Sequence, residues 1–133
     1  MTTKIEADWI LRTMAAMAAA DQRLDAREVT LIQRVYEELT GTAVDVSGVM
    51  SAVQVYARKD VAEDLAGVAG GFSQEAKAAI MYGAYRTLAA NDHVSPAERE
   101  ALERIAAALR LTGSELEAIL AQADDASNEP TSP

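Results

Sequence analysis

The sequence contains no cysteine among its 133 residues, only one histidine, and few aromatic residues. The lack of cysteine excludes disulfide bonds, thiolate zinc sites and cysteine catalysis. Aromatic residues make up 5% of the chain, whereas hydrophobic residues, mainly Ala, Leu, Val, Ile and Met, make up 50%. Small and unbranched apolar side chains of this kind favour closely packed helices. We therefore expect an all-α protein, and the length suits one domain.

Positive charge is also scarce. The chain has 12 Lys and Arg against 21 Asp and Glu, which gives a formal net charge of −9. This balance argues against binding nucleic acid through its phosphates and against adsorption to anionic lipid. No apolar run approaches the roughly 18 residues that cross a bilayer, and the first residues lack a signal-peptide core. We expect a cytoplasmic protein without direct membrane insertion, whose partners are other proteins and whose oligomeric state the sequence leaves open.

One stretch of the chain occurs twice. Residues 18–28 read AAADQRLDARE and residues 88–98 read LAANDHVSPAE. Asp21 aligns with Asn91 and Glu28 with Glu98, so that both pairs are 70 positions apart (91 minus 21, 98 minus 28). Each copy consists of a small-residue helix end, a short polar loop and the start of a new helix. We therefore expect a single globular domain built from two pseudo-symmetric helical repeats.

The second helix of each copy opens with the pattern of a capping box. Asp25 or Ser95 can accept a hydrogen bond from the backbone N–H three residues on. Glu28 or Glu98 can reach back to the N–H of that cap residue. Pro96 suits the first helical position, where its missing N–H has no partner to lose. The sequence thus predicts helices that begin directly after both loops.

Apolar spacing and cap residues predict seven helices in all. Asp45 or Ser47 is expected to open the third helix, Ser73 to cap the fifth and Ser114 to cap the seventh. The polar, proline-containing end of the chain is expected to be disordered, so that the domain spans residues 1–124 and the tail residues 125–133. The expected helices cover about residues 6–20, 26–39, 45–56, 61–68, 73–90, 96–109 and 114–124.

The two motif copies, with matching apolar positions before and after each loop, resemble the tellurite-resistance TerB family. The N-terminal domain of membrane-anchored J-domain co-chaperones carries similar motifs. The resemblance covers about residues 11–120, which is nearly the whole chain. It implies a non-enzymatic, all-helical domain of about seven helices with an acidic surface suggested to chelate metal. The family is associated with bacterial resistance to tellurite and other chemical stress.

The resemblance places the motif acids of the family on Asp21 and Glu28 in the first loop and on Glu98 in the second. This sequence departs from the family where Asn91 replaces the second-loop Asp. The Gly that often follows that Asp in the family is absent from both loops. Because an amide is a neutral and weaker ligand than a carboxylate, we expect the first loop to hold an ion more tightly.

Both loops offer the several oxygen ligands that a hard divalent cation needs. An EF-hand does not fit, because counting Asp21 as the first position puts Ala26 where Gly is needed and Ile32 where the bidentate Glu belongs. The candidate ligands for a divalent ion such as calcium, magnesium, manganese or zinc are Asp21, Asp25, Glu28, Asn91, Asp92 and Glu98.

The alternative is that the same side chains only cap helices and turns. The protein would then be a protein–protein interaction adaptor that binds no metal. His93 lies in the second loop, but no nucleophile motif or second histidine accompanies it, so we expect no enzyme activity and no catalytic residues. The sequence therefore predicts an acidic, non-enzymatic helical module of a bacterial stress or tellurite-resistance system.

Overall fold

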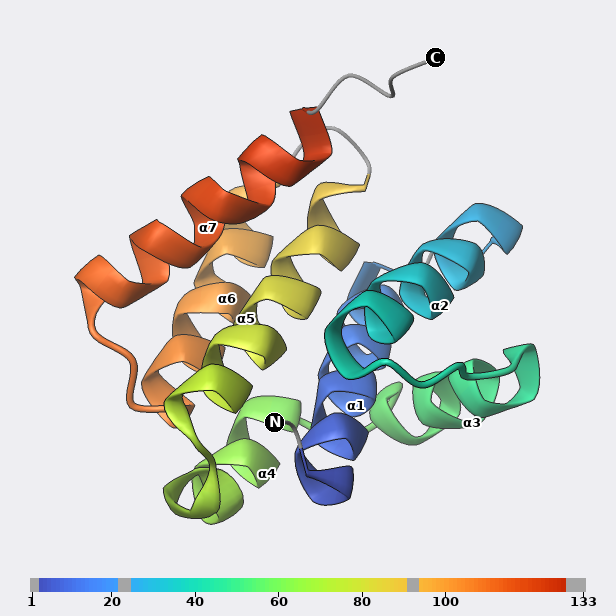
Figure 1. The fold of residues 1–133 in the computed structure, drawn as a ribbon, viewed down its shortest axis with the longest axis horizontal. Helices are drawn as coiled ribbons and strands as arrows, with labels where there is room; N and C mark the ends of the chain where they lie inside the picture. The colour runs from blue at the N-terminus through green and yellow to red at the C-terminus, as the bar shows by residue number, and fades with distance from the viewer. Residues whose placement is uncertain (1–2, 22–24, 91–93, 129–133) are drawn as a thin grey trace.

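A computed structural model describes residues 3–21, 25–90 and 94–128 of the chain (Figure 1). Every regular element in these residues is helical, which confirms the all-α fold class and the seven expected α-helices. A short 3-10 helix, η1 (Ala69–Gly71), follows the fourth. The α-helices are α1 (Lys4–Asp21), α2 (Ala26–Thr40), α3 (Val46–Tyr56), α4 (Val61–Val68), α5 (Gln74–Ala89), α6 (Pro96–Ala108) and α7 (Gly113–Asn128).

Four helices begin at a cap residue that the sequence predicts. In each case a side-chain oxygen accepts a hydrogen bond from the backbone N–H three residues on, at 2.7 to 3.1 Å. Such a bond satisfies one of the N–H groups that a helix start leaves without an intrahelical partner. Local sequence therefore fixes these starts. The four residues are Asp25, Asp45, Ser73 and Ser95.

The first and last helices begin earlier than expected, and both begin with a capping box. The Thr3 N–H donates to Glu6 at 2.9 Å, and the Glu6 N–H donates back to the Thr3 hydroxyl at 3.1 Å. Thr112 and Glu115 exchange the same two bonds at 2.8 and 3.1 Å. The expectation that Ser114 caps the seventh helix was wrong, because Thr112 has a Glu three residues later and accepts the bond instead.

The core is centred on α1, which packs most extensively against α5 and then against α3. Both α1 and α5 contribute fully buried side chains, among them Ile10, Met14, Ile80 and Met81. The two helices approach closely at Gly83, where a Cβ atom would lie only 3.0 Å from the Cγ and Sδ atoms of Met14. The packed pair of α1 and α5 therefore forms the centre of the fold.

The remaining helices cover this pair from several sides. In Figure 1, α2 and α7 lie on opposite sides of α5, and both pack against it. The short α4 packs mainly against α6. None of the helices in the described residues combines the length and the apolar character that a membrane crossing needs.

Two expectations remain predictions. α7 continues to Asn128, four residues beyond the expected end of the domain at 124, while residues 129–133 lie outside the described residues. The division into a domain and a disordered tail is therefore untested. The two pseudo-symmetric repeats are not established by the helix content, although Asp25 and Ser95 cap α2 and α6 in equivalent ways.

Candidate functional site

The first group of candidate ligands lies at the start of α2. Asp25 is exposed, and its Oδ1 atom accepts the Glu28 N–H at 2.9 Å. The Glu28 side chain is only 6% exposed. A carboxylate next to the first turn of a helix interacts favourably with the positive end of the helix dipole. The start of α2 therefore holds one exposed and one buried carboxyl group within a single turn.

Of the candidate ligands in the second loop, the described residues include Glu98, at the start of α6. The Glu98 N–H donates to the Ser95 hydroxyl at 3.1 Å, and the Ser95 N–H donates to Glu98 Oε1 at 2.9 Å. Both bonds of the predicted capping box are therefore present. One carboxylate oxygen of Glu98 is thus already bound within its own helix start.

The start of α2 and the end of α5 line a common pocket. A pocket of about 510 Å³ is lined by the start of α2, including Asp25 and Glu28, and by Ala90 directly after α5. Asp25 closes the first loop, and Ala90 opens the second. One pocket therefore contacts the described residues that follow the first loop and the residue that precedes the second.

The described residues do not by themselves form a metal site. Asp21 is the last residue of α1, but its side chain lies outside the described part, as do Asn91 and Asp92. Within the described residues there is no group of three or more His, Cys, Asp or Glu side chains placed to hold a metal ion. Asp25, Glu28 and Glu98 are thus insufficient alone, and the metal site stays a prediction.

A buried carboxyl group that the sequence analysis did not single out lies at the opposite end of α1. Glu6 is 4% exposed, and its Oε2 atom accepts the backbone N–H of Ser73 at 2.9 Å. Its other oxygen accepts the Thr3 N–H, and this bond, followed by the one from Ser73, lowers the pKa of Glu6. Both oxygens are thus engaged by backbone groups. The role of Glu6 is to join the start of α1 to the start of α5.

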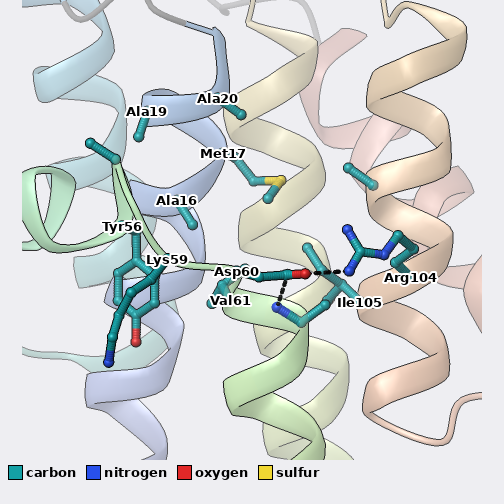
Figure 2. Close-up of a pocket in the computed structure, with 13 residues that line it drawn as sticks. Ala16, Met17, Ala19, Ala20, Tyr56, Lys59, Asp60, Val61, Arg104 and Ile105 are labelled. Atoms are coloured by element: carbon teal, nitrogen blue, oxygen red, sulfur yellow. Dashed lines mark hydrogen bonds and ion pairs between the residues drawn. The ribbon is translucent and has the colours of Figure 1, made fainter.

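A second pocket, of about 300 Å³, lies between α1, the segment before α4, and α6 (Figure 2). Its walls are mostly alanine and aliphatic side chains, including Met17 and Ile105. Figure 2 shows Asp60 and Arg104 pointing toward each other at one side of the pocket. Arg104 donates to Asp60, which lowers the pKa of that carboxyl group. Arg104 therefore has its charge balanced by a carboxylate within the pocket lining.

Comparison with known proteins gives one match. The family described as "Tellurite resistance protein TerB" matches residues 10–121 of the chain. This span includes both motif loops and runs from α1 into α7. Neither the curated proteins nor the solved structures include a match.

Proposed function

The chain belongs to the TerB family of tellurite resistance proteins, and on this premise we propose that it holds a divalent metal ion with its acidic inter-helix loops. Membership fits a helical domain related to tellurite resistance. In our proposal the protein acts without enzymatic activity, in the cytoplasm, as an acidic module of a bacterial stress response. Calcium, magnesium, manganese and zinc are the candidate ions.

The observation that supports the proposal is the pocket between the start of α2 and the end of α5, the helix ends that flank the two motif loops. Asp25 and Glu28 line it from α2 together with Arg27 and Arg34, and Ala90 lines it from the end of α5. An ion that needs six or more oxygen ligands can collect them more readily from two adjoining loops than from one. Oxygen ligands from Asp21, Asn91 or Asp92 would have to complete the set. When bound, the ion would link the two halves of the chain.

The rival function is a protein–protein adaptor whose loops only cap helices. The complete capping box of Ser95 and Glu98 favours this alternative, because Glu98 Oε1 already accepts a backbone N–H at 2.9 Å. A carboxylate that is bound locally has fewer lone pairs for a metal.

A thermal-shift experiment distinguishes the two functions. The chloride salt of each candidate ion (calcium, magnesium, manganese or zinc) is added separately to chelator-treated protein at constant ionic strength. An ion at about 100 times its dissociation constant adds roughly 2.7 kcal/mol to the free energy of unfolding, so the melting temperature should rise clearly. Glu28→Gln should abolish most of that rise, because glutamine keeps an oxygen acceptor but loses the charge.

The matched control is Glu37→Gln, which makes the same change at an exposed position of α2. This variant should keep the full metal-dependent rise. If no ion at roughly millimolar concentration shifts the melting temperature of the unaltered protein, metal binding is excluded at relevant strength and the adaptor function takes its place. If Glu98→Gln abolishes the shift and Glu28→Gln does not, the ranking of the two loops is wrong.

A further inference from the structure

A third pocket, of about 370 Å³, is a groove that lies over α5 between α2 and α7. Figure 1 shows α5 between these two helices, which lie on its opposite sides. α2 and α7 each pack against α5 but do not form an extensive pair with each other. The groove is lined at the end of α2 and shares no lining residue with the pocket at the start of that helix. It is therefore separate from the candidate metal ligands.

The floor of the groove is apolar and partly open. Ala78, Ala79 and Tyr82 of α5 are partly buried and pack against the hydrophobic core. Leu39 of α2 and Ile119 of α7 line the sides. Residues 75, 78, 79 and 82 share one face of α5, because residues three and four apart lie next to each other on a helix. Two adjacent alanines on that face let another backbone approach closely.

A helix is an occupant that a groove between two helices can take. Packed helices lie 8–10 Å apart in general, and ridges of side chains fill the groove between two neighbours. A guest helix over α5 would contact α2 on one side and α7 on the other. Its apolar residues would cover side chains that are now partly exposed to water, which is the usual way an amphipathic helix binds a groove.

Charge determines which helix fits. The rim carries Glu38 from α2 and Glu75 from α5, both exposed. Arg86 lies one turn beyond Tyr82, but it donates to the Tyr82 hydroxyl at 2.9 Å and lies 5.6 Å from that ring. An acidic helix would be repelled by these two carboxylates and by the overall net charge of −9. A second copy of the chain would meet the same repulsion, whereas a basic guest is attracted.

We propose that this groove binds an amphipathic helix of a partner protein that carries Lys or Arg beside its apolar face. The proposal goes beyond the proposed metal function and does not depend on it. The partner residues would contact Ala78, Ala79 and Tyr82 through aliphatic side chains and Glu38 through a basic one. The groove therefore provides a protein-binding surface at the opposite end of α2 from the motif loops.

The test uses two synthetic helical peptides of about four turns that carry the same leucines. One has lysines beside the leucine face, and the other has glutamates. Each is titrated into the isotope-labelled full chain at about 0.15 M salt, where charges more than roughly 8 Å apart are largely screened. The lysine peptide should shift the backbone amide signals of α5 and of its neighbours in α2 and α7. The glutamate peptide should bind at least roughly tenfold more weakly.

Two matched pairs of variants assign the site. Glu38→Lys should weaken binding of the lysine peptide by roughly fivefold or more. Glu37→Lys, at the preceding residue of α2 and outside the groove lining, should change binding by less than about twofold. Ala79→Arg should block peptide binding at the floor of the groove. The control is Ala66→Arg, which makes the same change at an exposed position of α4. Circular dichroism melts verify that all four variants fold.

The proposal is overturned if Glu38→Lys and Glu37→Lys weaken binding equally, because the attraction would then be that of any acidic surface. It is also overturned if the two peptides bind alike, or if the shifted signals lie away from α5. Concentration-dependent shifts at α5 without peptide would mean that a second copy occupies the groove. None of these outcomes changes the metal-dependent melting temperature, so the two proposals fail separately.

Discussion

Glu6 illustrates how a single buried side chain can serve two helix starts. One of its oxygens completes the capping box of α1, and the other accepts the Ser73 N–H at the start of α5. A buried carboxylate is tolerated when hydrogen bonds replace its lost hydration. The result is a link between residues 67 positions apart, made from a local helix cap.

Replacing this side chain should destabilise the protein in a pH-dependent way. Glu6→Gln leaves one oxygen acceptor where two are needed, so we expect a loss of about 1–3 kcal/mol at neutral pH. The pKa of Glu6 is lowered from 4.5, chiefly by the Thr3 N–H. Its ionised form therefore stabilises the fold above pH 4.5, and this contribution is lost as the pH falls through the lowered pKa.

Urea unfolding between about pH 3 and pH 7 checks this prediction. The difference in unfolding free energy between the unaltered protein and Glu6→Gln should shrink below pH 4.5. Glu37→Gln, which alters an exposed carboxyl group, serves as the control and should show no such loss at neutral pH. A constant difference across the whole range would show that the charge of Glu6 contributes nothing.

The pKa of Tyr85 is shifted in the opposite direction from that of Glu6, and its effect on stability falls at alkaline pH. Its hydroxyl donates to Asp124 of α7 at 2.6 Å, and this bond is the largest reason that the pKa of Tyr85 rises to about 12. The neutral form is therefore favoured in the fold, and its contribution is present below pH 10 and lost as the pH rises toward 12. Tyr85→Phe should lack this alkaline loss of stability.

Ultraviolet absorbance titration tests the same residue directly. One of the four tyrosines should ionise near pH 12 in the folded protein. Asp124→Asn removes the charge but keeps an acceptor, so it should move the pKa of Tyr85 back toward 10. If the titration curve of Asp124→Asn coincides with that of the unaltered chain, the bond between α5 and α7 does not exist in solution.

At the scale of single residues, the sequence predicts local contacts well and distant ones poorly. Ser95 and Glu98 form the predicted box because both partners lie within one helical turn. Thr112 was not predicted as a cap although its Glu lies three residues later, because Ser114 was the cap residue that the sequence indicated. The bond from Ser73 to Glu6 has no sequence signal, because it depends on how two helix starts meet in space.

The most extensive helix pair in the fold is α1 with α5, and Gly83 lets these two helices approach closely. Alanine normally favours a helix over glycine by about 1 kcal/mol. At position 83, however, a Cβ atom would lie 3.0 Å from two atoms of the fully buried Met14. We expect Gly83→Ala to destabilise the protein by about 1–3 kcal/mol, because the Met14 chain must shift inside a packed core.

The matched variant is Gly67→Ala in α4, where nothing lies within 4 Å of the added Cβ. That change should stabilise the protein by about 0.4–1 kcal/mol. Thermal or urea unfolding of the two variants measures both effects. If Gly83→Ala also stabilises the protein, Met14 adapts without cost and the contact between α1 and α5 is looser than the distances indicate.

At the scale of elements, periodicity predicts which residues form helices but not which helices meet. The equivalent helices α1 and α5 form the most extensive pair, while α2 and α6 form no comparable one. Ile5 looks like a core residue by its chemistry, but it is 68% exposed on α1. The sequence of one helix determines where its apolar face lies. Which residues bury that face depends on how several helices pack together. The groove over α5 was not predictable for this reason.

The charge of the whole molecule should make its stability depend on salt. With a net charge of −9, the folded chain repels itself more strongly than the expanded chain does. Raising sodium chloride from about 0.01 M to about 0.15 M shortens the screening length from about 30 Å to about 8 Å. We expect the melting temperature to rise by at least about 2 °C. A fall would mean that ion pairs such as Arg12 with Asp8 outweigh the repulsion.

The pairing of α1 with α5 also has a consequence during protein synthesis. α1 ends at residue 21 and α5 at residue 89, so the ribosome adds 68 residues between them (89 minus 21). At about 5–20 residues per second, this takes roughly 3–14 s. α3 can cover part of α1 earlier, but the side of Met14 that meets Gly83 stays uncovered until α5 emerges. The nascent chain therefore exposes a helix rich in alanine and methionine for seconds, which is long enough for a ribosome-associated chaperone to bind it.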